Sequence, residues 1–181
     1  MNGDIITIRP ETGNDFGEIS EVVRLAFRDM PESDHTEHLL VTRLRQSEAY
    51  VPDLSLVAED SNGKIVGHIM LSEVKVISGD GSRTLLSVAP LSVLPGYQRQ
   101  GIGGMLVREA HARASKAGYT GSVLLGHKDY YPRFGYRRAS AYGISFPFDA
   151  PDECCMAAEL TEGGLDCIHG VVKYPDAFLL E

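Results

Sequence analysis

The chain reads Gln98-Arg99-Gln100-Gly101-Ile102-Gly103-Gly104 at the point where an apolar run gives way to a helical pattern. The apolar run covers residues 91–95, and the helical pattern covers residues 105–117. The first backbone N–H groups of a helix have no partner inside it, and the helix dipole adds about half a positive charge there. The glycines remove side chains that would hold a ligand away from those N–H groups. This stretch therefore predicts a site for a phosphate-bearing ligand.

Composition limits the classes of protein that this chain can form. Its 181 residues are 43% hydrophobic and 23% charged, which fits one folded domain with a sizeable core. Lysines and arginines number 17 against 25 aspartates and glutamates, so the formal net charge is −8. The lack of a basic excess argues against a general nucleic-acid binder. The acidity indicates either simple solubility or a weak preference for cationic substrates.

The cysteines and histidines indicate neither a disulfide framework nor a metal site. Cys154, Cys155 and Cys167 form no CxxC pair. His35 and His38 lack a third ligand cluster, so a surface pair is the better interpretation. The N-terminus has no basic and apolar leader pattern, and no run approaches 18 apolar residues. We therefore expect a cytoplasmic protein with no metal and no membrane contact.

Hydrophobic periodicity predicts alternating strands and helices. Strands are expected at residues 5–9, 54–58, 65–76, 84–94, 122–125, 136–138, 156–160 and 170–174. Amphipathic helices are expected at residues 16–27, 36–45 and 103–117. Asn62-Gly63 is a hairpin turn signal, and Asp15 with Glu18 resembles a capping box. Because a helix joins the strands at 84–94 and 122–125, these two strands should be parallel. The pattern predicts a mixed α/β sheet in one domain over residues 1–181.

Several motifs resemble one known family. Gln98-x-x-Gly101-x-Gly103 has the form Q/R-x-x-G-x-G/A, the acetyl-CoA pyrophosphate signature of the GCN5-related N-acetyltransferases, or GNAT family. Tyr131-Pro132-Arg133-Phe134-Gly135-Tyr136 looks like the family's later Y-x-x-x-G-F/Y motif, and Ile8-Arg9-Pro10 is similar to its N-terminal opening. The order and spacing match over a core of residues 5–140. The C-terminal strands, within residues 141–181, resemble one subgroup of small, mostly uncharacterised members.

The resemblance implies a GNAT fold, a mostly antiparallel central sheet with one splayed parallel strand pair, flanked by helices. The pair would be residues 87–94 and 122–126. Acetyl-CoA would lie in the split, its pantetheine arm against the main chain of Leu91, Ser92 and Val93. Its pyrophosphate would bind backbone N–H groups of Gln98, Arg99, Gln100, Gly101, Ile102, Gly103 and Gly104. Four arginines either pair with its phosphates or remain solvated surface charges, namely Arg99, Arg133, Arg137 and Arg138.

The implied activity is acetyl-CoA-dependent N-acetylation, in which a primary amine attacks the CoA thioester directly. The acceptor stays open between a small-molecule amine and a peptide or protein amine, and the protein is either a monomer or a homodimer. No nucleic-acid partner is expected. The alternative function is a non-catalytic acyl-CoA-binding sensor or regulatory module. A dinucleotide-binding enzyme is disfavoured because no G-x-G-x-x-G follows an N-terminal strand.

The implied reaction needs a neutral amine, a donor for the developing oxyanion and a proton for the leaving thiolate. The backbone N–H near Val93 is the expected oxyanion donor. Tyr131 matches the tyrosine that opens the family's later motif, and we expect it to protonate the thiolate. Tyr130 is the less favoured alternative for that role.

The general base is left open by the sequence. The candidates are His127, Glu73 and His68, and bulk water is the remaining option. The pair Gly126-His127 stands where the family often has an Asn near the second splayed strand. The acceptor and pantetheine contacts therefore stay open at this point.

Overall fold

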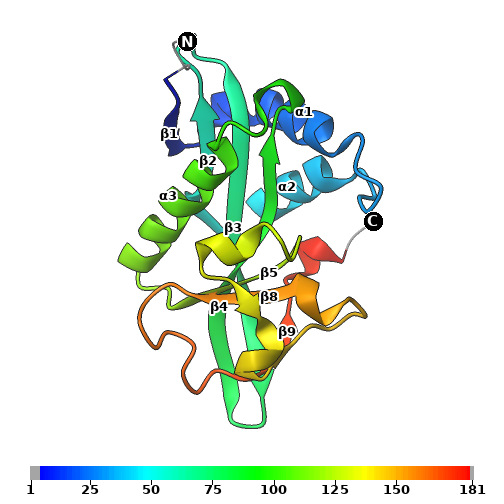
Figure 1. The fold of residues 1–181 in the computed structure, drawn as a ribbon, viewed down its shortest axis with the longest axis vertical. Coiled ribbons are helices and arrows are strands. Elements are labelled where there is room, and N and C mark those ends of the chain that lie inside the picture. The colour runs from blue at the N-terminus through cyan, green and yellow to red at the C-terminus, as the bar shows by residue number, and fades with distance from the viewer. Residues whose placement is uncertain (1–4, 180–181) are drawn as a thin grey trace.

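A long antiparallel hairpin of β3 (Ile65–Ser78) and β4 (Gly81–Val93) runs through the middle of the molecule. A computed structural model describes residues 5–179 (Figure 1). The strands form one mixed sheet in the order β1-β2-β3-β4-β5-β8-β6, with β9 paired to β3 and β7 paired to β9. The other strands are β1 (Thr7–Pro10), β2 (Tyr50–Glu59), β5 (Gly121–Leu125), β6 (Arg137–Arg138), β7 (Ile144–Ser145), β8 (Cys155–Glu159) and β9 (Gly170–Lys173). The α-helices of the described residues are α1 (Phe16–Phe27), α2 (Glu37–Arg45) and α3 (Ile102–Lys116).

The turn between β2 and β3 forms where Asn62-Gly63 predicts it. Gly63 has a φ of +81°, a left-handed conformation that glycine adopts without strain. β2 begins at Tyr50 rather than at the predicted residue 54, so that boundary is wrong. The pairing of β2 with β3 shifts register between Tyr50 and Ser55. This irregularity lets the strand include Pro52 and Asp53, two residue types that disfavour a regular strand.

The helices cover both faces of the sheet. In Figure 1, α3 crosses in front of the strands, and α1 lies behind them. Gly67 of β3 faces α3, because a Cβ placed there would stand 3.1 Å from Leu106 Cδ1. The buried side chains of α1 are Ile19, Val22 and Val23, and they join the same hydrophobic core. The predicted helices are confirmed with small shifts at their ends.

The predicted capping box of Asp15 and Glu18 is wrong. Asp15 stands at the N-cap of α1 without a side-chain capping bond. Its carboxylate instead accepts hydrogen bonds from Arg9 Nη1 at 2.8 Å and from Thr12 N at 2.7 Å. Glu18 accepts a hydrogen bond from Ile65 N at 2.9 Å. Charge-assisted bonds are stronger than neutral ones, so Arg9 outcompetes the backbone of α1 for Asp15.

β4 and β5 are parallel, as the intervening helix predicts, and they pair only briefly. Pairing joins Leu86 to Ser122 and Ser87 to Val123. Beyond these residues β5 stays paired with β8 and β4 stays paired with β3, so β4 and β5 part. Near the same point β4 carries an extra residue relative to β3, which bends the strand. The structure confirms the predicted fold class, a mostly antiparallel mixed sheet with one splayed parallel pair.

The C-terminal strands join the same sheet. β8 pairs with β5 along its whole length, and β9 pairs with the distal part of β3. Arg43 Nε of α2 donates a hydrogen bond to the Ala177 carbonyl at 2.9 Å, which ties this segment to α2. The assignment of residues 1–181 to one domain stays a prediction, and the expected absence of a leader at residues 1–4 lies outside the described residues. No helix within residues 5–179 is long and apolar enough to cross a membrane.

Candidate active site

A cleft of about 1040 Å³ opens where β4 and β5 part. We call one part of it the helix half, because it lies along β4 and the first turn of α3. The helix half is lined by Leu91, Val93, Gln98, Arg99, Gly101, Ile102, Gly103, Gly104, Arg108, Tyr130, Arg133 and Phe134. The loop half is lined by Phe27, Met30, Glu32, Ser33, Glu37, Leu40, Leu125, Gly126, His127, Asp149, Ala150, Pro151 and Cys154. Tyr131 also lines the cleft.

The main chain of β4 presents an open edge to the cleft. Leu94 N donates to Val66 O at 2.9 Å, so the backbone of Leu94 faces β3. Alternate residues of an antiparallel ladder face the partner strand, so the backbone groups of Leu91 and Val93 face away from β3. β5 is no longer paired with β4 there. The predicted contact residue Ser92 is placed differently: its backbone faces β3, and its side chain is buried.

The glycine stretch forms the loop that starts α3. Gly101 is the N-cap of α3 with a φ of +85°, and Arg99 has a φ of +62°. Left-handed residues in such a loop turn successive N–H groups toward one concave side, which is an arrangement that binds anions. A Cβ at Gly103 would stand 2.6 Å from Tyr130 Oη, so only glycine leaves this space open. The loop and the first turn of α3 together have the geometry of an anion site, and ligand binding by these residues stays a prediction.

The two glutamines of the stretch hold the loop in place. Gln98 Nε2 donates to the Val93 carbonyl at 3.0 Å, and Gln100 Nε2 donates to the Gly96 carbonyl at 3.2 Å. Because both side chains are used within the loop, a ligand would meet the backbone N–H groups of this segment rather than its glutamine side chains.

Basic side chains gather in the helix half. The Arg108 guanidinium lies 5.2 Å from the Phe134 ring centroid, and the Arg133 guanidinium lies 4.7 Å from that of Tyr130. These cation–π contacts position both charges at the cleft beside Arg99. Arg108 was not singled out in the sequence, because its contribution depends on the way α3 faces the cleft.

Two other predicted phosphate partners lie elsewhere. Arg137 and Arg138 line a separate, smaller hollow, and Arg138 Nη1 lies 3.3 Å from Asp152 Oδ2. The structure therefore brings Arg99 and Arg133 to the cleft and leaves this second pair of arginines outside it.

Tyr131 packs over the end of β5. A Cβ at Gly126 would overlap Tyr131 Cε2, so the glycine makes room for the ring. The ring meets Tyr130 edge-on at a centroid distance of 5.0 Å and Tyr136 at 5.7 Å. Burial raises the pKa of Tyr131 above its ordinary value, so its phenol keeps its proton at neutral pH. Tyr131 is thus a protonated hydroxyl group at the split between the strands.

A buried polar group supports this aromatic cluster. Tyr136 Oη lies 2.8 Å from Ser122 Oγ and 2.8 Å from His111 Nε2. Burial lowers the pKa of His111 to about 4, so the imidazole is neutral at pH 7. No local sequence pattern indicates this group, because its members come from α3, from β5 and from the residue before β6.

The structure separates the three candidate bases. His127 is exposed and lines the cleft next to Gly126. Glu73 does not line the cleft, and its Oε1 accepts a hydrogen bond from Tyr119 Oη at 2.6 Å. His68 is fully buried, and its Nε2 lies 3.1 Å from Glu11 Oε2. Of the three, only His127 reaches the cleft, because Glu73 faces the end of α3 and His68 faces the interior.

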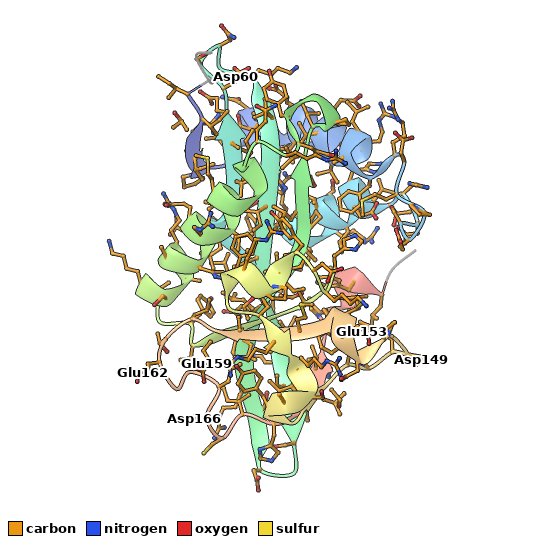
Figure 2. All side chains as sticks on the ribbon, viewed as in Figure 1. Asp60, Asp149, Glu153, Glu159, Glu162 and Asp166 are labelled. Carbon is orange, nitrogen blue, oxygen red and sulfur yellow. The ribbon has the colours of Figure 1, made fainter. Side chains whose placement is uncertain are left out.

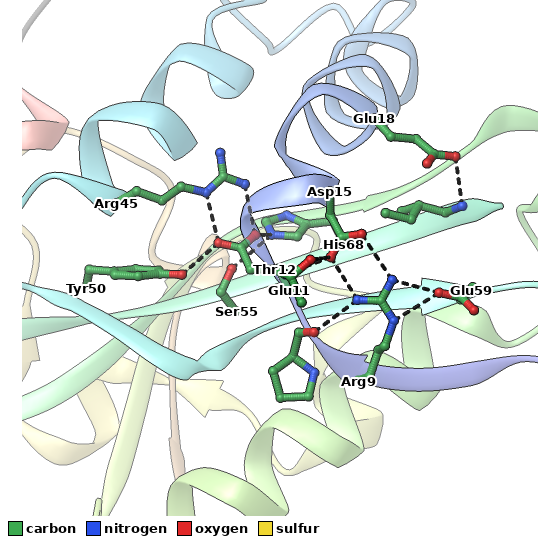
Figure 3. A network of polar contacts seen from close by, with 12 residues as sticks. Arg9, Glu11, Thr12, Asp15, Glu18, Arg45, Tyr50, Ser55, Glu59 and His68 are labelled. Atoms are coloured by element: carbon green, nitrogen blue, oxygen red, sulfur yellow. Dashed lines mark hydrogen bonds and ion pairs between the residues drawn. The ribbon is translucent and has the colours of Figure 1, made fainter. Parts of the chain in front are cut away.

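His68 belongs to a buried network that Figure 3 shows between β2, β3 and α2. Glu11 is the centre of the network, with a side chain 1% exposed. It accepts hydrogen bonds from Arg45 at 2.8 Å and from Tyr50 Oη at 2.7 Å. Burial opposes the ionisation of Glu11, but bonds from Arg45 and His68 outweigh it and hold its pKa well below its usual range. The network fixes α2, which lines the loop half, to the sheet.

The loop half is built by side chains from remote segments. Met30, Glu32 and Ser33 come from the loop after α1, and Glu37 and Leu40 come from α2. Asp149 belongs to the segment before β8, on the side of the view where α2 lies (Figures 1 and 2). Sequence reasoning missed Glu32 and Asp149, because a charged residue in a loop gives no local signal of its neighbours. Within residues 5–179, no three His, Cys, Asp or Glu side chains gather as a metal site.

These features define a class of protein. A parallel pair that splays beside a glycine-rich helix N-terminus belongs to an α/β domain that binds a phosphate-bearing ligand with main-chain groups. The second half of the same cleft leaves room for another ligand. Such a cleft suits the transfer of a group between two bound molecules.

Comparisons with known proteins give the particular family. The family model "Acetyltransferase (GNAT) domain" matches residues 7–139, and the chain therefore belongs to the GNAT family of acetyltransferases. It is 36% identical over 152 residues to the uncharacterized N-acetyltransferase YjhQ of Escherichia coli K12, covering 82% of this chain and 81% of YjhQ.

Two solved structures are also similar. The GNAT family N-acetyltransferase YhbS of Escherichia coli, solved in complex with CoA, has a TM-score of 0.88 and 27% identity, covering 99% of this chain and 95% of that one. A GNAT family acetyltransferase of Brucella melitensis, solved in complex with acetyl-CoA, has a TM-score of 0.78 and 35% identity, covering 96% of this chain and 98% of that one.

Proposed function

We propose that this protein is an acetyl-CoA-dependent N-acetyltransferase in which a primary amine attacks the thioester directly. The observation that carries the proposal is the open edge of β4 beside the first turn of α3, with Tyr131 across the split. Two relatives of similar fold are described with CoA or acetyl-CoA, which supports the same ligand for this cleft.

The residues of the helix half fit acetyl-CoA. The backbone N–H and carbonyl of Leu91 are suited to the amide groups of a pantetheine arm, as one strand edge is suited to another, whereas the Val93 carbonyl already accepts a hydrogen bond from Gln98. The N–H groups of residues 101–104 and the charges of Arg99 and Arg108 are suited to the pyrophosphate. A side chain at Gly103 would fill the space in front of Tyr130 Oη. When bound, acetyl-CoA supplies an activated acetyl group.

The chain's own groups handle charge and protons. The Val93 N–H points into the split and is placed to stabilise the negative charge that develops on the thioester oxygen. The Tyr131 hydroxyl, protonated because burial raises its pKa, delivers a proton to the leaving sulfur. Tyr130 Oη lies over the start of α3, so we propose a ligand contact for it rather than proton transfer.

The amine must lose a proton before it attacks. An alkylamine of pKa near 10 is about 0.1% neutral at pH 7, which costs about 4 kcal/mol. We propose that His127 accepts this proton directly or through water, because it alone of the three predicted bases lines the cleft. Neither Glu73 nor His68 is part of this proposal.

The test combines binding and turnover. Calorimetry measures CoA binding, and thiol release from acetyl-CoA measures turnover against a panel of primary amines. Binding with amine-dependent thiol release supports the enzyme. Binding without turnover on any amine would instead favour the acyl-CoA sensor, and the absence of CoA binding would overturn both functions. The cytoplasmic location and the choice between monomer and homodimer stay predictions.

A further inference from the structure

Charges in the cleft are separated by sign. The arginines that line it, Arg99, Arg108 and Arg133, all belong to the helix half. The carboxylates that line it, Glu32, Glu37 and Asp149, all belong to the loop half. No lysine or arginine lines the loop half among the described residues. The helix half therefore suits an anionic ligand, and the loop half suits a cationic one.

The three carboxylates of the loop half are not neutralised by the protein. None of them forms an ion pair with another described residue, although Glu37 accepts a hydrogen bond from the Ser33 hydroxyl. Carboxylates just outside the cleft do have partners: Glu153 lies 3.9 Å from Lys128 Nζ, and Asp152 is paired with Arg138. The three carboxylates that line the cleft are therefore available to a cationic ligand.

Apolar side chains form much of the rest of the loop half. Phe27, Met30 and Leu40 contribute side chains from α1, its following loop and α2, and Leu125 contributes one from the end of β5. An apolar wall next to unpaired carboxylates fits an aliphatic chain that carries a positive charge at its far end.

We propose that the acceptor is an aliphatic diamine or polyamine, whose second ammonium group occupies the loop half in the negative field of Glu32, Glu37 and Asp149 while its first amine enters the split. This inference rests on the proposed function, and it names the substrate class of that same cleft. An acceptor with a carboxylate at its far end would be repelled by the same three residues. The reaction itself is unchanged: the new C–N bond forms as the C–S bond breaks, the amine loses a proton, and CoA leaves as the thiol.

The test uses three acceptors of matched length: hexamethylenediamine, hexylamine and ε-aminocaproate. Thiol release from acetyl-CoA gives kcat/KM for each with the wild-type enzyme. We expect the diamine to exceed hexylamine roughly ten-fold and hexylamine to exceed ε-aminocaproate. The advantage of the diamine should shrink as ionic strength rises from about 0.01 M to about 1 M, because salt screens exposed charges.

Variants assign the preference to the named carboxylates. In Glu32→Gln and Asp149→Asn the ratio of kcat/KM for diamine over hexylamine should fall, and it should fall furthest in the double variant. Glu162→Gln removes an exposed carboxylate far from the cleft and should leave the ratio unchanged (Figure 2). Asp149→Lys should shift the preference toward ε-aminocaproate.

The outcomes distinguish an error in the substrate class from an error in the proposed function. If hexylamine is acetylated as well as the diamine, or the variants keep the wild-type ratio, the substrate class is wrong and the acetyltransferase stands. If no amine supports thiol release while CoA binds, the proposed function itself fails, and the substrate class fails with it.

Discussion

The two halves of the cleft are built in different ways. The helix half comes mainly from one continuous segment, residues 91–108, and it presents chiefly main-chain groups and glycines to the cleft. The loop half comes from three remote segments, residues 27–40, 125–127 and 149–154, and it presents side chains. A site made of backbone is fixed by the fold, whereas a site made of side chains changes with each substitution. The same scaffold can therefore keep one ligand and vary the other.

The largest expected effect is a loss of stability when the buried network that holds α2 is disrupted. Arg45→Met removes the cation that pairs with Glu11, whose side chain is 1% exposed. Loss of one partner leaves a buried charge unpaired, so we expect the free energy of unfolding to fall by about 3–5 kcal/mol. Denaturant titration measures this. CoA binding should change little, because the network touches α2 and not α3.

Arg24→Met is the matched control, because Arg24 pairs with Glu21 on the exposed face of α1. Solvent screens such an exposed pair, so this variant should be nearly as stable as wild type. If the free energy of unfolding fell equally in the two variants, the buried network would contribute no more to stability than a surface ion pair.

The pH dependence of stability follows from the same carboxylate. The pKa of Glu11 is held well below its usual range in the folded protein. As the pH falls below about 4.3, the unfolded chain takes up a proton at Glu11 that the folded protein does not. Stability should therefore be complete above that pH and decline below it. In Glu11→Gln the decline should be less steep, and an identical slope would contradict the assignment.

A second expected effect, at Tyr131 on the border of the two halves, distinguishes turnover from acetyl-CoA binding. Tyr131→Phe removes the hydroxyl but keeps the ring over Gly126, so kcat should fall about 100-fold while the KM for acetyl-CoA changes little. Steady-state thiol release measures both. Tyr119→Phe, whose hydroxyl bonds Glu73 outside the cleft, is the control and should keep most of its activity. Unchanged turnover in Tyr131→Phe would exclude it as the proton donor.

A third effect tests the helix half directly. Gly103→Ala places a methyl group 2.6 Å from Tyr130 Oη, where it obstructs the start of α3. We expect CoA to bind about 10-fold more weakly, which corresponds to about 1.4 kcal/mol. Calorimetry measures the affinity. Gly96→Ala, which meets nothing within 4 Å, should bind normally, and similar affinities in both variants would count against the loop as the anion site.

The smallest effect concerns the arginines. Arg108→Gln should weaken CoA binding about 3-fold at low salt, because an exposed ion pair contributes up to about 1 kcal/mol. Arg138→Gln should bind CoA as wild type does, since Arg138 lies outside the cleft beside Asp152. A larger effect in Arg138→Gln than in Arg108→Gln would place the phosphates elsewhere.

Features that depend on neighbours in the chain, as the helix half does, can be predicted from the sequence. The glycine stretch, the Asn62-Gly63 turn and the parallel pair depend on neighbours in the chain, and the structure agrees with all three. The carboxylates of Asp15 and Glu18 bind Arg9 and a β3 amide instead of capping α1, because tertiary partners outcompete local ones.

The loop half and the supporting groups could not be predicted in this way. Asp149 and Glu32 are far apart in the chain, and only the tertiary fold brings both to one cleft. Glu73 and His68 were both candidate bases on β3, because strand alternation alone does not say which face of β3 meets the cleft. Side-chain orientation in the folded sheet is the information that a single sequence lacks.

The open edge of β4 has a consequence for solubility. An unpaired strand edge is normally a template on which a second chain can pair and begin to aggregate. Here the backbone groups of Leu91 and the Val93 N–H, which face away from β3, lie inside a cleft bordered by α3 and by the rings of Tyr130 and Tyr131. A narrow flexible molecule can reach that edge, but the strand of another folded protein cannot. The fold can thus keep a reactive edge permanently exposed to a small ligand without exposing it to its own copies.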